Sequence, residues 1–255
     1  MLINLRNALM GGKRTPTAKD YVQSGLVAMW DSIENRGYGI TDLSTTAWKD
    51  CIGGYEIPIL QSGTDVYTWT GTSLKRIGTG GISAPLSGIA ALNQSSAADA
   101  WTIEVGMSMT TQVSVPTGSS GYMFANFSMN NSSRLIRIFS QGNLNVYVTP
   151  DANWYHNPDS VSLPFNRRTF VMGKTSIETS TAGRYEAFVG TNGELMTGTR
   201  VARAALGSSM NLFAVSAWAE TTTAEILFIR RYHRALTADE IAANYAIDKA
   251  RFGLP

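Results

Sequence analysis

The chain carries an apolar strand close to its C-terminal end. Residues 224–231 (AEILFIRR) are apolar at neighbouring positions rather than at every second one. In an unbroken strand, Ile226 and Phe228 would lie on one face of the sheet, and Leu227 and Ile229 on the other. Both faces of this strand are therefore expected to be covered, which requires a layer of structure on each side.

A short, clearly bounded helix is predicted directly after this strand, over residues 237–251. Thr237 is a favourable N-cap, and Glu240 lies where its carboxylate can accept a hydrogen bond from the amide of the cap residue. Gly253 tolerates the left-handed conformation that commonly ends a helix. A lone helix at the end of a β-rich chain restricts the fold to a few all-β architectures.

Composition limits the class of protein further. With 255 residues the chain is long enough for one large β-domain, and a formal net charge of +2 does not indicate a nucleic-acid surface. Cys51 is the single cysteine, so no internal disulfide is expected, and a buried structural thiol is indicated. No apolar run approaches the length of a membrane span, and the N-terminus lacks the pattern of a secretory signal. We therefore expect synthesis in the cytoplasm.

Strand patterns continue along most of the chain. In residues 101–109 (WTIEVGMSM), every second residue from Trp101 to Met109 is apolar, and Asn192-Gly193 predicts a tight hairpin turn. Further strands are expected at 25–30, 66–69, 74–77, 122–127, 134–139, 144–148, 167–174, 184–189, 194–201 and 211–215.

Three of these segments carry a resemblance to a known family. Tyr232-His233-Arg234-Ala235-Leu236 leads into a T-x-x-E-I helix start, residues 101–104 read WTIE, and 185–195 read as a hairpin with an N-G turn. These motifs resemble those of the laminin-G-like, or concanavalin A-like lectin/glucanase, jelly rolls. The resemblance covers residues 21–255. It implies an all-β jelly-roll sandwich with one short C-terminal helix.

Residues 1–20 are predicted to be a separate N-terminal arm. Its leucines would share one face of a short helix, which Gly11-Gly12 and Pro16 then interrupt. Two interpretations stay open: a tail packed on its own domain, or a docking peptide for another subunit. The docking interpretation assigns the contacts to Leu2, Leu5, Arg6, Leu9, Lys13, Arg14 and Lys19.

The opening of the chain carries a narrower resemblance. Residues 5–14 (LRNALMGGKR) and 17–35 resemble the start of laminin-G-like proteins that are encoded by tailed phages and prophages of gut bacteria. This resemblance implies a virion protein, made in the host cytoplasm and released by lysis. Its partners would be other virion proteins, bound through the arm in a multi-subunit assembly.

The best candidate for a binding surface is the loop at residues 149–160, where aromatic and polar side chains are concentrated. An aromatic ring can cover the apolar face of a sugar while amides and carboxylates bind its hydroxyl groups, and a similar mixture suits a protein interface. A third interpretation is that Trp154 only caps the edge of the sandwich. The candidate contacts to glycan or protein are Asp151, Asn153, Trp154, Tyr155, His156, Asn157 and Asp159.

No metal or other cofactor is expected. Related jelly rolls often bind calcium through loop acids, and two sets of residues offer suitable oxygens. Neither set has the spacing of a recognised calcium-binding loop, so solvated acids are the preferred interpretation. The two sets are Asp151, Asn153 and Asp159 in the later loop, and Asp42 and Asp50 in the earlier one.

Catalytic residues are not indicated either. Retaining sugar hydrolysis requires two carboxyl groups about 5–5.5 Å apart, and glucanases of this superfamily place them on one strand. Here the corresponding strand has Glu104 alone, with Gly106 where a second acid would lie. Asp31 and Glu34 are close in sequence but wrongly spaced, so Glu104 is interpreted as structural.

These observations predict a non-enzymatic, lectin-like structural or adhesive protein of a phage particle. The arm would dock to the head, neck or tail, and the sandwich would face outward and bind a host-surface or mucosal glycan. The alternatives are a bacterial carbohydrate-binding protein or a glycoside hydrolase.

Overall fold

The structure is a computed structural model that describes residues 14–59, 65–78, 82–85, 100–109, 125–128, 136–140, 144–148, 161–163, 169–177, 183–191, 194–201, 209–212 and 222–254. A 3-10 turn (Ala18–Asp20) comes first. The strands are β1 (Leu26–Asp31), β2 (Ala47–Lys49), β3 (Glu56–Pro58), β4 (Val66–Trp69), β5 (Leu74–Gly78), β6 (Ile82–Pro85), β7 (Trp101–Met109), β8 (Ala125–Ser128), β9 (Ile136–Ser140), β10 (Leu144–Val148), β11 (Val161–Leu163), β12 (Thr169–Ile177), β13 (Gly183–Thr191), β14 (Glu194–Val201), β15 (Ser209–Leu212) and β16 (Thr222–Tyr232). The helix α2 (Ala238–Phe252) ends the described chain.

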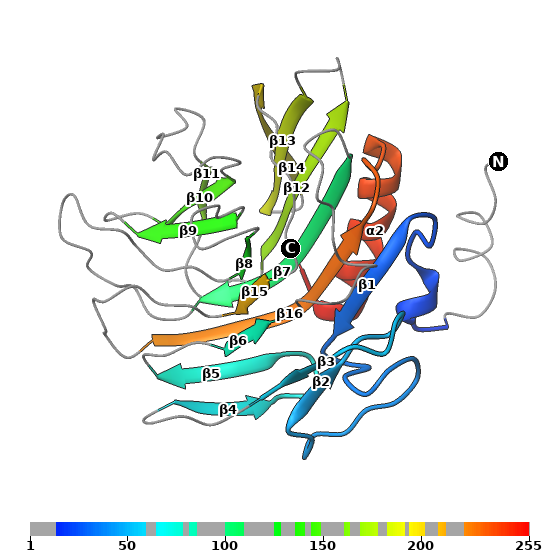
Figure 1. The fold of residues 1–255 in the computed structure, drawn as a ribbon, viewed down its shortest axis with the longest axis vertical. Coiled ribbons are helices and arrows are strands. Elements are labelled where there is room, and N and C mark those ends of the chain that lie inside the picture. Colours follow the sequence, from blue (N-terminus) through cyan, green and yellow to red (C-terminus); the bar gives the residue numbers. More distant parts are fainter. Residues whose placement is uncertain are drawn as a thin grey trace.

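The main sheet is antiparallel and is organised around β16. Its strand order is β14-β13-β12-β7-β16-β5-β4, and β1 also pairs with β16. Along one edge of β16, residues 222–226 pair with β5 and residues 228–232 pair with β1. Two strands that are distant in sequence therefore lie end to end beside the same partner (Figure 1).

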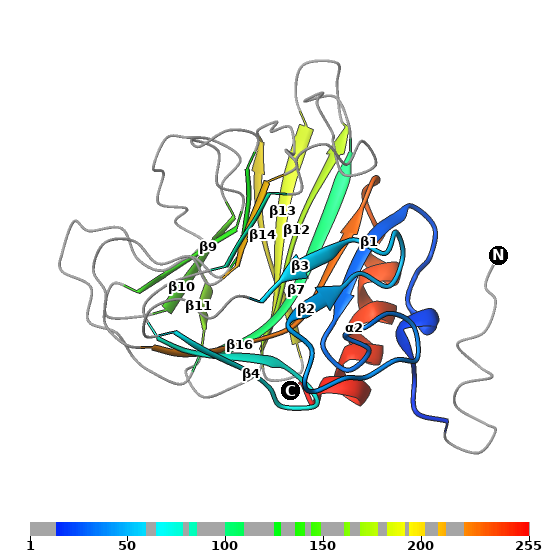
Figure 2. The ribbon, with the colours of Figure 1, turned by 60° about the horizontal axis from the view of Figure 1, so that its bottom comes forward.

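The helix α2 and the sheet of β9, β10 and β11 lie on opposite sides of the main sheet (Figure 1 and Figure 2). The smaller sheets have the orders β11-β10-β9, β6-β15-β8 and β2-β3. In both Figure 1 and Figure 2, α2 lies on the side of the main sheet that faces away from β9, β10 and β11. This arrangement explains why β16 is buried on both faces, as its sequence predicts: Ile226, Leu227, Phe228 and Ile229 are all inaccessible to solvent.

A β-bulge in β16 changes which of these side chains share a face. Ile226 pairs with Met107, whereas Phe228 pairs with Gly106, so Leu227 is an extra residue in the strand. Because Gly106 and Met107 are neighbours in β7, they face opposite sides, and so do Ile226 and Phe228. The prediction that Ile226 and Phe228 lie on one face is therefore wrong.

The helix has the boundaries that its sequence indicates. The Thr237 side chain accepts a hydrogen bond from the Glu240 amide, and the Glu240 carboxylate accepts one from the Thr237 amide at 2.9 Å. Gly253 adopts a left-handed conformation with φ of 64°, and its amide donates to the Lys249 carbonyl. The predicted capping box and glycine end are confirmed.

The predicted all-β architecture with a C-terminal helix is also confirmed. Thr191 pairs directly with Glu194, which leaves only two residues to connect β13 to β14, as a tight turn requires. The short strands β2, β3, β6 and β11, of three or four residues each, are not among the strands that the sequence predicts. In the described residues, no helix is long and apolar enough to span a membrane.

Candidate functional site

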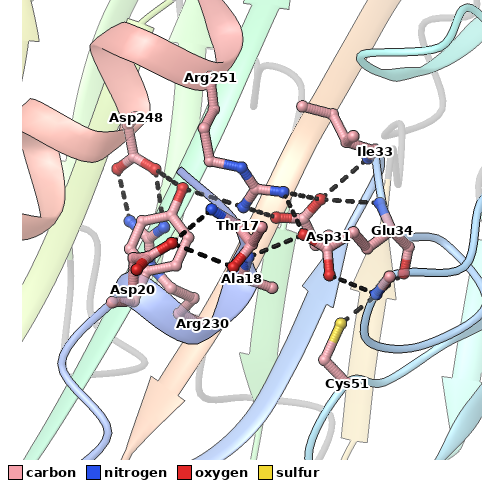
Figure 3. Close-up of polar contacts among 12 residues, drawn as sticks. Thr17, Ala18, Asp20, Asp31, Ile33, Glu34, Cys51, Arg230, Asp248 and Arg251 are labelled. Carbon is pink, nitrogen blue, oxygen red and sulfur yellow. Dashed lines mark hydrogen bonds and ion pairs between the residues drawn. The ribbon is translucent and has the colours of Figure 1, made fainter. Parts of the chain in front are cut away.

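The densest group of ionisable side chains in the described residues lies between α2 and the main sheet. We call it the buried charge cluster. It is built by five parts of the chain that meet there: the segment before β1, the end of β1 with the turn after it, the strand β7, the strand β16 and the helix α2. Its members are Tyr21, Asp31, Glu34, Glu104, Arg230, Tyr232, Asn244, Asp248 and Arg251. Figure 3 shows the polar contacts around Arg230 and Arg251.

Arg230 joins the sheet to the helix. Its Nε donates to Glu104 Oε2 on β7 at 2.6 Å, and its two terminal nitrogens donate to both oxygens of Asp248 on α2 at 2.7 and 2.5 Å. The guanidinium carbon lies 4.0 Å from the ring centres of both Tyr21 and Phe228. The charge is thus held by two carboxylates at its edge and by aromatic rings against its faces.

Arg251 forms the second half of the cluster. It donates to Asp31 Oδ2 at 2.5 Å and Oδ1 at 3.2 Å, and to Glu34 Oε1 at 2.8 Å. Asp31 Oδ1 also accepts the amides of Ile33 and Glu34 at 2.9 and 3.0 Å. These bonds fix the last turn of α2 to the end of β1.

The segment before β1 is bound by the same groups. The Tyr21 hydroxyl donates to Asp248 Oδ1 at 2.6 Å and accepts from Arg251 at 3.4 Å. The Val22 amide donates to Asn244 Oδ1 at 3.0 Å, and the Ala18 amide donates to Glu34 Oε1 at 2.8 Å. The start and the end of the described chain are therefore held together by buried polar contacts.

The cluster contains more acids than bases. Its four carboxyl groups share two guanidinium groups, which leaves an excess of two negative charges if all six of these groups are ionised; the acids are Asp31, Glu34, Glu104 and Asp248. Burial raises the pKa of Asp31, Glu104 and Asp248, and the two arginines oppose this effect only in part. The pKa of Arg230 is well above its ordinary value, because the carboxylates of Asp248 and Glu104 outweigh the effect of burial.

This geometry suits a structural role better than a catalytic one. Glu104 and Asp248 are fully buried, so neither carboxylate reaches solvent or a bound sugar. A side chain at Gly106 is excluded as well, because its Cβ would lie 2.3 Å from Cε1 of Phe228. The position where a glucanase-like second acid would lie is thus occupied by an aromatic ring.

The cluster is not among the features predicted from the sequence, although two signals for it exist. Arg230 directly follows four apolar residues of β16, Ile226 to Ile229, and such a charge must be paired if it is buried. In the helix, Asn244, Asp248 and Arg251 recur at intervals of four and three residues, so they share the face that also buries Ile241. Polar residues on a buried helix face indicate a network beneath the helix.

The predicted binding loop lies outside the described residues. This applies to Asp151, Asn153, Trp154, Tyr155, His156, Asn157 and Asp159 alike. Of the two acids in the earlier loop, Asp50 accepts the amide of Met29 at 2.5 Å and that of Gly53, and Asp42 accepts the amide of Ser44 at 2.8 Å. In the part of the chain that is described, no group of three or more His, Cys, Asp or Glu side chains is placed to hold a metal ion.

Only the last part of the predicted docking arm is described. Leu2, Leu5, Arg6, Leu9 and Lys13 lie outside the described residues. Several of residues 14–20 contact their own sandwich or one another.

Arg14 pairs with Asp20, and the ammonium group of Lys19 lies 5.3 Å from the ring centre of Tyr38. Ala18 is completely buried in the core beneath α2. The last residues of the predicted arm, 14–20, therefore attach it to its own sandwich. Cys51 is buried as expected, and burial raises the pKa of its thiol above the ordinary range.

Comparisons with known proteins identify the fold. No family model matches the sequence, and no curated protein matches it. Among solved structures, the chain is similar to the binding domain of botulinum neurotoxin serotype C1, at 12% identity over 89% of this chain and 52% of that chain, with a TM-score of 0.58. It is also similar to Trypanosoma rangeli sialidase in complex with sialic acid, at 12% identity over 94% of this chain and 35% of that chain, with a TM-score of 0.56.

The chain therefore spans about half of the first of these structures and about a third of the second. At such low identity the likeness concerns the fold alone. Together with the observed sheets, it confirms the predicted jelly-roll β-sandwich with one C-terminal helix.

Proposed function

We propose that this chain is a non-enzymatic, lectin-like adhesive and structural protein of a phage particle. The observation that carries the proposal is the β-sandwich fold, which this chain shares with proteins that interact with glycans. One similar structure is of botulinum neurotoxin type C, whose cell entry depends on interaction with two ganglioside molecules. Another is a sialidase in complex with sialic acid. The sandwich would face outward and bind a host-surface or mucosal glycan, and the arm would dock to other virion proteins.

The buried charge cluster supports the non-enzymatic part of the proposal. Hydrolysis of a glycosidic bond needs carboxyl groups that reach the sugar. Glu104 is inaccessible and is bound to Arg230 and Asn244, and Asp31 and Glu34 are bound to Arg251. Each of these acids already has a partner inside the fold.

Glycan binding is expected to depend on Trp154. We expect the purified protein to bind components of a glycan array that includes sialylated and mucin glycans, and to release no reducing sugar from them. Trp154→Ala should abolish this binding without changing the melting temperature, whereas Trp154→Phe, which keeps an aromatic face, should retain most of it. If Trp154 instead fills the edge of the sandwich, Trp154→Ala should destabilise the fold by about 3–5 kcal/mol. Release of sugar that Glu104→Gln abolishes would refute the non-enzymatic assignment.

Deletion of residues 1–13 is expected to separate folding from assembly. The deletion stops before Arg14 because Arg14 pairs with Asp20 and the nearby Ala18 is buried in the core. The shortened protein should keep the melting temperature of the full chain but be missing from purified phage particles when their proteins are quantified by mass spectrometry. Incorporation at the level of the full-length protein would show that the arm is not the docking element.

A further inference from the structure

The segment that precedes β1 is held in place by side chains of the buried charge cluster. We call residues 17–22 the strap. Among the described residues, its one hydrogen bond between two backbone groups is internal, from the Asp20 amide to the Thr17 carbonyl at 3.1 Å. Four side chains of the cluster bind the strap from other elements: Glu34, Asn244, Asp248 and Arg251. The position of the strap therefore depends on the cluster.

The helix α2 depends on the same side chains. Asn244 Oδ1 accepts a backbone amide of the strap at 3.0 Å, while Asn244 Nδ2 donates to Glu104 on β7. Asp248 likewise accepts from Tyr21 in the strap and from Arg230 in the sheet. A displacement of α2 therefore breaks the contacts of the strap, and a displacement of the strap removes hydrogen bonds from two buried side chains of α2.

Apolar packing couples the strap to α2 as well. Ala18 and Tyr21 of the strap belong to the same buried core as Ile241 and Phe252 of α2. All four side chains are at most 2% exposed. Segments that share both their polar partners and their apolar core are expected to open together, in one cooperative step.

Glu104 is the acid of the cluster with the weakest set of hydrogen-bond donors. Each carboxylate oxygen of the other three acids accepts a hydrogen bond of 2.9 Å or shorter. Glu104 Oε2 accepts from Arg230 at 2.6 Å, but in the described part of the chain Oε1 accepts only from Asn244 Nδ2, at 3.2 Å. That nitrogen also lies 3.0 Å from Oε2 and 3.0 Å from the Tyr232 hydroxyl. Oε1 is therefore the carboxylate oxygen best suited to hold a proton.

One guanidinium group serves two buried carboxyl groups at this point. The ionisable groups on the elements around Glu104 are Arg230 and Tyr232 on β16, Asp248 and Arg251 on α2, and Tyr21 in the strap; in β12, the register places Met172 opposite Glu104 and Lys174 opposite Thr102. Arg230 also donates to both oxygens of Asp248, and neither carboxyl group is accessible to solvent. Burial disfavours an uncompensated negative charge and raises the pKa of Glu104.

We propose that Glu104 carries a proton at neutral pH, and that the strap and α2 form a latch that stays closed while this proton is bound. As pH rises, loss of the proton leaves an uncompensated carboxylate beneath the helix, and the strap and α2 open as one unit. The strands β12 and β13 keep their structure, because their backbone pairing does not involve the cluster. The latch does not depend on the proposed function.

Hydrogen–deuterium exchange, measured by mass spectrometry over a series of pH values, tests the latch. Protection factors, which correct for the pH dependence of intrinsic exchange, are compared between peptides from the strap and α2 and peptides from β12 and β13. In the wild type, the strap and α2 should lose protection together, by up to about tenfold for each pH unit, because closing the latch binds one proton. The peptides from β12 and β13 should keep their protection.

Two variants separate the proton from the coupling. Glu104→Gln, which has no ionisable group at this position, should keep the strap and α2 protected as pH rises. Tyr21→Phe removes a hydrogen bond between the strap and α2, and it should lower the protection of α2 by the same factor as that of the strap. Tyr67→Phe on β4 is the matched control, because the charged groups near its hydroxyl are Asp65 and Arg76, outside the cluster. It should leave the protection of both segments unchanged.

Infrared spectroscopy detects the proton itself. At neutral pH the wild type should show the carbonyl band of a neutral carboxylic acid, and Glu104→Gln should lack it. If Asp248→Asn removes the band while Glu104→Gln retains it, the proton belongs to Asp248 and the proposal is overturned. An equal pH dependence of protection in the wild type and Glu104→Gln would also overturn it, and so would full protection of α2 in Tyr21→Phe.

Discussion

Replacing Arg230 with methionine is expected to destabilise the fold by about 3–5 kcal/mol. Methionine keeps most of the side-chain volume but removes the guanidinium group, and so leaves Glu104 and Asp248 fully buried without their shared cation. It also removes the cation that lies against the rings of Tyr21 and Phe228. Equilibrium urea denaturation, followed by tryptophan fluorescence, measures the change in free energy of unfolding.

Arg36→Met is the matched control for this prediction. Arg36 pairs with Glu56 at 3.0 Å, but their side chains are 31% and 46% exposed. Water already stabilises both charges there, so the loss should be about 1 kcal/mol or less. Equal losses for the two variants would show that the buried pairs contribute no more than a surface pair. A partial recovery of stability when Arg230→Met is combined with Asp248→Asn would confirm that an uncompensated carboxylate causes the loss.

The stability that the cluster contributes is also expected to fall as pH rises above the ordinary pKa values of its carboxyl groups. Burial raises the pKa of Asp31 and Asp248 above 3.8 and that of Glu104 above 4.5, which are their ordinary values. Between those values and the raised ones, the folded state binds more protons than the unfolded state, so the stability contributed by these groups falls as pH rises. This stability is fully present below the ordinary pKa values of the three carboxyl groups. It is lost as pH rises through the raised pKa values of the folded state. A tenfold difference in proton affinity between the folded and unfolded states corresponds to about 1.4 kcal/mol.

Glu104→Gln separates this effect from the other acids. The variant removes one of the excess negative charges, so the fall in melting temperature as pH rises above the ordinary carboxyl pKa values should be smaller than in the wild type. Other carboxyls have lowered pKa values and oppose the trend, among them Glu240, which is bound to Arg234, and Asp42, which is bound to Ser44. They are present in both proteins and cancel in the comparison. An unchanged pH dependence in Glu104→Gln would show that Glu104 takes up no proton.

The two predictions concern the same physical feature, which connects parts of the chain that are far apart. Tyr21 and Asp248 are separated by 227 residues, and Arg251 and Asp31 by 220. Loss of the cluster should therefore loosen α2 and the anchor of the N-terminal arm together.

The sequence alone determined those helix ends and strand boundaries whose signals lie within a few residues of one another. Thr237, Glu240 and Gly253 define the ends of α2 because a capping box and a left-handed end need only residues within a few positions of one another. The strands β4, β7, β10 and β14 have the predicted boundaries, since alternation of apolar and polar residues is a local property. The predicted glycan loop, with Trp154, and the leucines of the arm lie outside the described residues and stay predictions.

Tertiary structure decided the rest. The extra residue Leu227 turns Phe228 towards α2, and this bulge depends on how β16 pairs with β7, not on the composition of β16. The ionic partners of Arg230 and Arg251 were equally hidden, because a sequence shows that a charge is present but not which distant carboxylate reaches it. Local hydrogen bonds and periodicity select the elements of this fold, whereas the pairing of its buried charges depends on long-range packing that brings β1, β7, β16 and α2 together.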